Sequence, residues 1–381
     1  MGGPLAGVRV LELAGIGPAP YAALVLADLG AEVLRVDRPV PYAVPGADLD
    51  PTADLTRRNR RSAVLDLTRP EGVGAVLTMC AAADVLLEGF RPGVAERLGV
   101  GPEACRGRNP RLVYGRMTGW GQEGPLAGAA GHDLTYLAVT GALHALGRAG
   151  APPTVPLNLL GDLAGGGLWL ALGVLAALWE RDRSGQGQVV DAAIIDGTAH
   201  LTTLFHGLLA AGLWRDERGV NLLDGGAPFY DVYRTADGGW LAVGALEDRF
   251  YAELVAGLGL TPEEADRSDP REWPALRARI AAAVARRTRA EWAAVFDGSD
   301  ACAAPVLSLT EAPDHPQLRA RGTFVQVGGV RQPAPAPRFD RTPNPDPVPP
   351  PVPGADTRAA LADWGVPDVA GLLAAGVARQ A

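Results

Sequence analysis

His132 and Asp162 are the side chains of this sequence best suited to moving a proton. His132 lies in AAGHDLTYLAVTG, residues 129–141, and is one of five histidines in the chain. Asp162 lies in PLNLLGDLAGGG, directly before the apolar segment 163–179. An imidazole titrates near neutral pH, and a desolvated carboxyl can hold a proton there, so the two could form an acid–base pair. Each also has a structural interpretation: His132 as a polar residue leading into a core helix, and Asp162 as a helix cap.

The apolar segment 163–179 predicts a long helix, with Asp162 at the N-cap position. A helix N-terminus has unpaired N–H groups and partial positive charge. A carbonyl oxygen held there by the N–H of Asp162 would be stabilised as it became an enolate. Glycines 165–167 would let a ligand or another backbone approach closely. A carboxylate, an imidazole and an oxyanion donor together predict a site for proton abstraction.

Several arginines stand in loops that follow predicted strands. The chain contains no lysine, so arginine, histidine or backbone N–H groups must hold any phosphate. We interpret Arg38 as a contact to a ribose phosphate, with a solvated strand end as the alternative. A series of basic loops predicts an extended polyphosphate ligand, although clustered arginines can also form a solvated face. The other arginines in these loops are Arg57, Arg58, Arg60, Arg61, Arg91 and Arg97.

Composition excludes several classes of protein. The net charge of −8 argues against a general nucleic-acid binder. AGIGPAP has prolines where a dinucleotide fingerprint needs glycines, which argues against NAD(P) binding. The three cysteines lack metal-ligand spacing, so we expect reduced thiols, no zinc and a cytoplasmic location. No export signal is visible, and segment 163–179 contains three consecutive glycines and is followed by ERDR, so we expect a buried helix and no membrane span.

The chain alternates short apolar strands with helices over its first half. VRVLEL, AEVLRVDRP, SAVLDL, DVLLEGF and RLVYGRMTG read as strands, which predicts an α/β fold with a Rossmann-like parallel sheet in a large domain, residues 1–215. The segment FYDVYRTADGGWLAVGAL reads as a strand, a tight turn and a strand, opening a smaller α+β domain, residues 216–330. Residues 331–381 read as a proline-rich arm that returns to the large domain and ends in short helices.

Many collinear segments resemble the class III CoA-transferase superfamily (CaiB/BaiF type) and, within it, the α-methylacyl-CoA racemases. They include GPLAGVRVLELAGIGPAPYAALVLADLGAEVLRVDRP, RRNRR, LLEGFRPGVAERLG, RLVYGRMTGWGQEGP, GHDLTY, PLNLLGDLAGGG, GQGQVVDAAIIDG, LLDGGAPFYDVY and VGALEDRFY. The resemblance implies an interlocked homodimer, each chain threading through the other. It places the active site between the large domain of one subunit and the small domain of its partner. It implies no metal and no other cofactor, because coenzyme A is part of the acyl-CoA substrate.

The resemblance also implies roles for individual residues. His132 and Asp162 match the acid–base residues on opposite faces of the α-carbon, Glu247 matches a carboxylate that supports the histidine, and Asn158 matches a residue that orients the site. Relatives tend to have a lysine near Thr68, and we expect Arg69 to replace it here. The matched CoA contacts are Arg38, Leu65, Asp66, Leu67, Thr68, Gly89, Phe90, Arg91, Arg97, Gly131, His132, Asp133, Leu134, Thr135 and Tyr136.

The histidine distinguishes two activities within this superfamily. In its transferase branch the residue matching Asp162 is a nucleophile that forms an acyl anhydride, and there is no histidine at the position of His132. Inversion of a stereocentre needs two proton carriers, whereas acyl transfer needs one nucleophile. We therefore expect a racemase of 2-methylacyl-CoA thioesters, with CoA transfer as the alternative and a non-catalytic CoA-binding module as a third. The acyl chain would lie near Met117 and Leu222, and its identity stays open.

Overall fold

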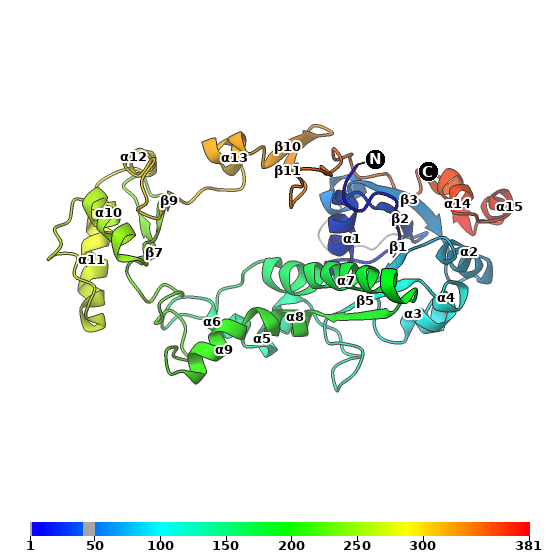
Figure 1. The fold of residues 1–381 in the computed structure, drawn as a ribbon, viewed down its shortest axis with the longest axis horizontal. Helices are drawn as coiled ribbons and strands as arrows, with labels where there is room; N and C mark the ends of the chain where they lie inside the picture. Colours follow the sequence, from blue (N-terminus) through cyan, green and yellow to red (C-terminus); the bar gives the residue numbers. More distant parts are fainter. Residues whose placement is uncertain (1, 41–49) are drawn as a thin grey trace. The chain divides into compact units, whose positions relative to one another are not determined.

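The chain folds into two compact units, each with its own sheet (Figure 1). The structure, a computed structural model, describes residues 2–40 and 50–381. Unit 1 comprises residues 1–140, 157–201 and 320–381, and unit 2 comprises residues 141–156 and 202–319. The mixed α/β class with a parallel-sheet core, expected from the sequence, is confirmed.

Unit 1 is built on a sheet of seven strands among the described residues, in the order β12-β3-β2-β1-β4-β5-β6. β1 to β6 are parallel, and β12 runs antiparallel to β3. Because β1 lies between β2 and β4, the chain changes direction across the sheet there. Parallel sheets bind ligands at such a switch point, beyond the carboxyl ends of the strands. The strands are β1 (Arg9–Leu13), β2 (Glu32–Asp37), β3 (Arg60–Leu65), β4 (Val85–Glu88), β5 (Val113–Thr118), β6 (Val189–Ala193) and β12 (Ala378–Arg379).

Helices cover both faces of this sheet because successive side chains of each strand point to opposite faces. Leu11, Leu34 and Leu86 face one apolar core, and Val10, Val33 and Val85 face the other. The first core is closed by α2 (Pro70–Cys80), α4 (Pro102–Arg108), α14 (Thr357–Asp363) and α15 (Val369–Ala374), and the second by α1 (Pro18–Asp28) and α7 (Leu168–Ser184). Unit 1 also contains the 3₁₀ turns η1 (Pro51–Ala53) and η2 (Leu55–Arg57), α3 (Val94–Leu98), α5 (Asp133–Val139), the π-helix η3 (Leu159–Gly167), α8 (Ile194–Leu201), and the hairpin β10 (Phe324–Val327) and β11 (Val330–Pro333).

The helical segment Leu159–Ser184 is long and apolar enough to cross a membrane by length and composition alone. One side of it packs against the sheet, since Leu170, Val174 and Ala177 are buried in the second core. Near its end, Arg181 forms an ion pair with Asp84 at 2.9 Å. This side of the helix therefore contributes to the core of unit 1.

Unit 2 holds an antiparallel sheet of β7 (Tyr230–Arg234), β8 (Trp240–Gly244) and β9 (Ala303–Pro305). The predicted strand–turn–strand pattern over 229–246 is confirmed by the pairing of β7 with β8. Leu241, Leu254 and Trp292 lie in the core between sheet and helices. The helices are α6 (Ala142–Ala145), α9 (Thr203–Ala210), α10 (Asp248–Leu258), α11 (Trp273–Val284) and α12 (Arg289–Val295), with 3₁₀ turns η4 (Pro270–Glu272) and η5 (Ala312–Asp314); α13 (Pro316–Ala320) ends at the border with unit 1.

The unit borders differ from the domain borders expected near 215 and 330. Residues 141–156 belong to unit 2 because Arg218 donates to the carbonyl oxygens of His144, at 2.8 Å, and Ala151, at 3.0 Å. Residues 320–381 belong to unit 1. There Ser62 N–H donates to Asp356 at 3.0 Å and β12 extends the sheet beside β3.

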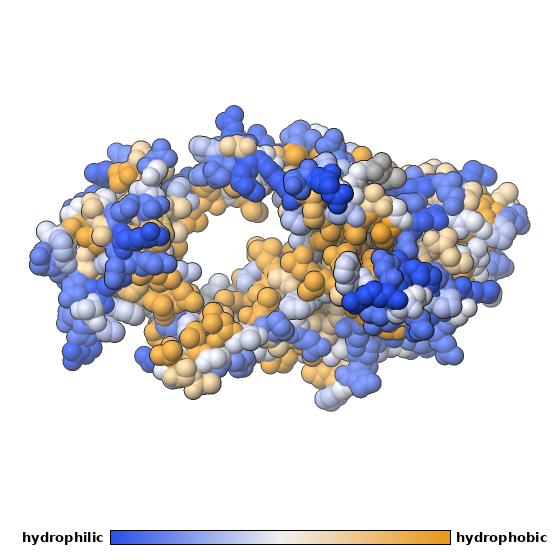
Figure 2. All heavy atoms as spheres, viewed as in Figure 1, coloured by the Kyte–Doolittle hydropathy of each residue, from blue (hydrophilic) through white to orange (hydrophobic). Residues whose placement is uncertain are grey.

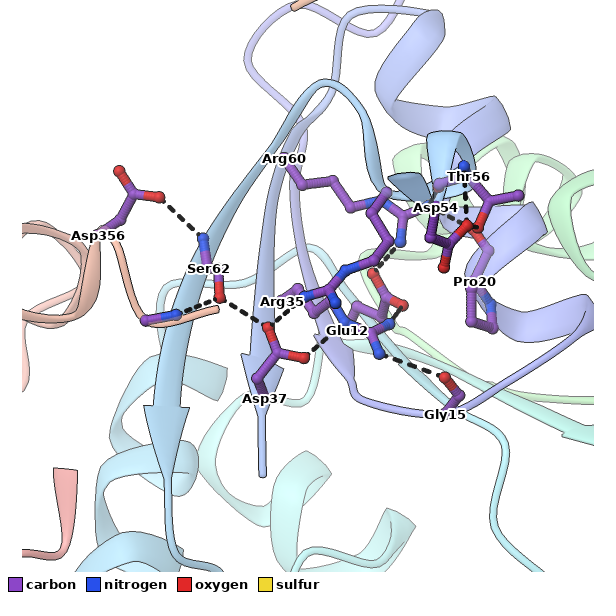
Figure 3. A network of polar contacts seen from close by, with 12 residues as sticks. Glu12, Gly15, Pro20, Arg35, Asp37, Asp54, Thr56, Arg60, Ser62 and Asp356 are labelled. Atoms are coloured by element: carbon purple, nitrogen blue, oxygen red, sulfur yellow. Dashed lines mark hydrogen bonds and ion pairs between the residues drawn. The ribbon is translucent and has the colours of Figure 1, made fainter. Parts of the chain in front are cut away.

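Three arginines of RRNRR, Arg57, Arg58 and Arg60, are buried, and Figure 3 shows Arg60 in a polar network with Glu12, Arg35 and Asp37. Arg60 is fully buried and pairs with Glu12 at 2.7 Å. Arg35 bonds to the other oxygen of Glu12 and to Asp37 at 2.9 Å. Arg57 reaches the second oxygen of Asp37 at 2.8 Å. The expectation of an anionic ligand at this cluster was therefore wrong, because carboxylates distant in the sequence already neutralise these cations.

This network predicts a large loss of stability when its central anion is neutralised. Glu12→Gln leaves Arg60 buried without its carboxylate partner and leaves Arg35 with Asp37 alone, so we expect the free energy of unfolding in urea to fall by about 3–5 kcal/mol. The matched control is Glu71→Gln, which removes an exposed pair with Arg69 and should cost at most about 1 kcal/mol. Equal effects of the two variants would show that the buried network does not stabilise the fold.

Candidate active site

A cavity of about 750 Å³ opens in unit 1 at the carboxyl ends of β1, β4, β5 and β6. This is the switch point of the parallel sheet, where a ligand is expected. The cavity is formed by the loops after these strands and by the segments that lead into α1, α5 and the π-helix. Its lining consists of residues 15–18, 89–92, 94, 97, 117–120, 127, 129–132, 136, 158, 162 and 194.

Asp162 lies in the first turn of the π-helix η3, which continues directly into α7. The prediction that Asp162 is the N-cap was wrong, because the helix begins at Leu159 and Asn158 occupies the cap position. The glycines at 165–167 let other segments of the chain pack closely against this helix. A Cβ atom on Gly165 would lie 2.3 Å from Thr198 Oγ1, and one on Gly167 would lie 2.7 Å from the carbonyl oxygen of Pro18. π-Helical turns are frequent at functional sites.

The carboxyl of Asp162 is half-buried, and burial raises its pKa. A weak hydrogen bond from Asn158 Nδ2, at 3.4 Å, opposes this rise, the charge of Asp133 adds to it, and His132 lowers the pKa. The backbone N–H of Asp162 donates to Asp133 Oδ1 at 2.6 Å. The expectation that this N–H stabilises an enolate was therefore wrong, since a carboxylate already accepts it.

His132 occupies the N-cap position of α5 and is exposed to the cavity. The backbone N–H of His132 donates to Thr135 Oγ1 at 3.0 Å, and this hydroxyl donates to the backbone carbonyl of His132 at 2.7 Å. The backbone is thus fixed at the start of α5, and His132 lines the cavity that Asp162 also lines. An imidazole and a carboxyl that line the same cavity can exchange protons with a ligand between them.

Tyr136 lines the cavity together with His132 and Asp162. Its ring lies between Gly119 and Gly131, where added Cβ atoms would approach ring carbons within 2.0 and 2.5 Å. It also packs edge-on against Trp120, with ring centroids 4.7 Å apart. Sequence reasoning missed Trp120 and the use of the 15–18 loop as cavity wall. The position of that loop directly after the first strand, at the switch point, could have identified it.

The cavity brings together part of the predicted CoA-binding set. On its lining are Gly89, Phe90, Arg91, Arg97, Gly131, His132 and Tyr136, together with Met117. Arg91 and Arg97 add positive charge to the lining, and Phe90 and Met117 add apolar surface. A thioester that carries both anionic and apolar groups is compatible with this mixed lining.

Other predicted residues lie outside the lining. Arg38 follows β2, and residues 65–68 begin at the last residue of β3. Both therefore lie at the edge of the sheet formed by the carboxyl ends of the parallel strands, on the two strands that lie on the side of β1 away from β4. Leu65 itself is buried, and Asp66 Oδ1 accepts the N–H of Thr68 at 3.0 Å. Arg69 donates to the carbonyl of Ala375 at 2.8 Å. Contacts of these residues with CoA stay predictions.

The remaining predicted residues are placed as follows. Asp133 is buried, with its carboxylate on the Asp162 N–H, and Leu134 and Thr135 are exposed on the first turn of α5. Glu247 lies in unit 2, exposed at the N-cap position of α10. Leu222 is also in unit 2 and exposed. Within residues 2–40 and 50–381 no group of three or more His, Cys, Asp or Glu side chains could hold a metal ion.

The chain has relatives over nearly its whole length. The profile of CoA-transferase family III matches residues 5–357. An α-methylacyl-CoA racemase of Mus musculus is 48% identical over 342 residues, which cover 89% of this chain and 87% of the relative. The Homo sapiens racemase is 46% identical over 341 residues, with the same coverage. A crystal structure of a CaiB/BaiF family protein from Brucella suis has a TM-score of 0.78 at 26% identity, covering 96% of this chain and 100% of that one.

Proposed function

The chain belongs to CoA-transferase family III, and we propose that it is a racemase that interconverts the (2R) and (2S) forms of 2-methylacyl-CoA thioesters. The observation that carries this proposal is that His132 and Asp162 line the same cavity at the switch point of the sheet. Two proton carriers facing one ligand are what inversion at an α-carbon requires. The two racemases at 46 and 48% identity support the same activity.

The reaction proceeds by proton transfer at the α-carbon. For one enantiomer neutral His132 removes the α-proton, the thioester becomes an enolate, and protonated Asp162 returns a proton to the opposite face. For the other enantiomer the two residues exchange roles. Burial raises the pKa of Asp162, which favours the protonated carboxyl that half of the cycle needs. The Asp162 N–H donates to Asp133, so stabilisation of the enolate oxygen would require another donor.

The substrate supplies its own coenzyme A, and the mechanism uses no other cofactor and no metal. Arg91 and Arg97, on the cavity wall, would meet phosphates of CoA, with Arg38 and residues 65–68 further along the same edge of the sheet. The acyl chain would lie on Phe90 and Met117. This activity would place the protein in lipid metabolism, and a cytoplasmic location stays a prediction.

The second candidate is transfer of CoA between an acyl-CoA and a carboxylic acid. The accessible carboxyl of Asp162 favours it, because such a group could attack a thioester and form an acyl anhydride. His132 has no part in that reaction. Trapping of an acyl group on Asp162 with hydroxylamine would support transfer.

Incubation of a pure 2-methylacyl-CoA enantiomer with the protein tests the proposal. We expect an equal mixture of enantiomers at equilibrium, with no carboxylic acid acceptor required. A panel of thioesters with branched fatty acyl, sterol side-chain and 2-arylpropionyl groups would show which acyl chain is preferred. The absence of inversion across the panel, with CoA transfer to an added acid, would replace the racemase by the transferase.

We further propose an interlocked homodimer in which Glu247 of one subunit supports His132 of the other. Exposed apolar side chains support an oligomer: Leu168, Leu172 and Trp179 on α7, and Leu204 on α9. Orange side chains gather over the start of α7 and over α9 (Figure 2). Exposed apolar side chains gathered on one helix can mark interaction sites.

Light scattering on the purified protein is expected to give twice the mass of the 39.5 kDa chain. Leu172→Asp, which places a charge on the exposed face of α7, should lower that mass towards one chain and reduce activity with it. A wild-type mass of a single chain, with full racemase activity, would contradict the dimeric site.

A further inference from the structure

Asp133 is buried directly beside the turn that carries Asp162. The residue is 9% exposed, although it begins a helix at the cavity wall. Its Oδ1 accepts the N–H of Asp162 at 2.6 Å. A Cβ atom on Gly161 would lie only 2.3 Å from the same oxygen, so the glycine is what lets the carboxylate reach the backbone. Two segments far apart in the sequence are thus joined at the site.

The hydrogen bond satisfies a group that the π-helix cannot satisfy itself. Asp162 is the fourth residue of Leu159–Gly167, and the first N–H groups of a helix have no partner within it. A carboxylate that accepts such an N–H forms a charge-assisted bond, stronger than one between neutral groups. Asp133, on α5, therefore caps this turn of the π-helix. Because His132 directly precedes Asp133 in the sequence, the same bond links the backbone of Asp162 to the segment that carries His132.

The same carboxylate acts on the Asp162 side chain through its charge. The titratable groups that interact with the Asp162 carboxyl are His132, Asp133 and Tyr136, all from α5 and its cap, and Asn158 adds a hydrogen bond. Burial is the largest cause of the raised pKa of Asp162, and the negative charge of Asp133 raises this pKa further. Asn158 and His132 act in the opposite direction.

We propose that Asp133 is a positioning residue for the acid–base carboxyl: its buried carboxylate accepts the Asp162 N–H, fixes the backbone that carries this side chain, and places a negative charge beside it. The proposal rests on the racemase function proposed above. It gives Asp133 a role through Asp162, in addition to any main-chain contact with CoA.

Two variants separate the hydrogen bond from the charge. Asp133→Asn keeps an oxygen that can accept the Asp162 N–H but removes the charge, whereas Asp133→Ala removes both. We expect kcat/KM to fall in the order wild type, Asn, Ala, with the alanine variant on the order of 10- to 100-fold below wild type. The acid limb of the pH profile of kcat/KM should move to lower pH in both variants. Loss of a neighbouring negative charge lowers the pKa of Asp162, so that carboxyl keeps its proton only at lower pH.

The matched control is Asp84→Asn. Asp84 also accepts a backbone N–H, that of Arg9 at 2.9 Å, and lies in unit 1 outside the cavity lining. A purely structural role predicts that both asparagine variants lose stability and that neither changes the pH profile. Circular dichroism and urea unfolding would establish that Asp133→Asn and Asp133→Ala are folded.

A titration that needs no substrate keeps the inference separate from the proposed function. The Asp162 carboxyl carbon, observed by NMR in protein labelled with [4-¹³C]aspartate and assigned with Asp162→Asn, should titrate at lower pH in Asp133→Asn than in wild type. Unchanged titration and an unchanged pH profile in that variant would overturn the inference while leaving the racemase intact. Failure of the wild type to invert any thioester would overturn the racemase, and the titration would still decide what Asp133 does to Asp162.

Discussion

Asp162→Asn is expected to lower the kcat of racemisation by about 10²- to 10⁴-fold, the usual contribution of a positioned acid or base. The amide has nearly the shape of the carboxyl, and the backbone N–H that bonds to Asp133 is kept, so the turn should persist. What disappears is the group that accepts or returns a proton on one face of the α-carbon. Chiral chromatography of the thioester over time measures the rate.

The control for this variant is Asp191→Asn. Burial also raises the pKa of Asp191, but this residue lies on β6 and does not line the cavity. Its replacement should leave kcat within about twofold of wild type, since substitutions away from a site have small effects. A nearly active Asp162→Asn variant would remove this carboxyl from the mechanism.

His132→Ala is expected to abolish racemisation and to slow exchange of the α-proton in only one of the two enantiomers. The enantiomer whose α-proton faces residue 132 should lose exchange in heavy water by about 10²- to 10⁴-fold. The other enantiomer should still exchange without inversion, because Asp162 can remove its proton and return a deuteron to the same face. His144→Ala, a half-exposed histidine of unit 2, is the matched control and should behave as wild type.

Local patterns predicted the parallel-sheet fold and the edge of the sheet at which the candidate cavity lies. The alternation of strands and helices sufficed for the parallel sheet, because each strand is a short apolar run between polar turns. Ends of parallel strands meet at one edge, so Phe90 and Arg91 in the loop after β4 and Met117 near the end of β5 could be expected near a common ligand.

Some features depend on contacts between residues distant in the sequence, and local patterns did not predict them. The arginines of RRNRR look like a surface for anions until Glu12 and Asp37, on other strands, are placed beside them. Asp162 looks like a helix cap because the preceding segment carries no sign that the helix begins in π form at Leu159. The bond between Asp133 and the Asp162 N–H joins residues that are 29 positions apart, and no local rule indicates it.

Exchange of the α-proton in heavy water, followed by NMR for each pure enantiomer with Asp162→Asn and His132→Ala, tests the central claim most directly. The two residues are proposed to serve opposite faces of one carbon. Each variant should therefore exchange only one enantiomer, and the two variants should retain opposite ones. Exchange of both enantiomers at the wild-type rate in either variant would contradict the assignment of His132 and Asp162 as the two proton carriers.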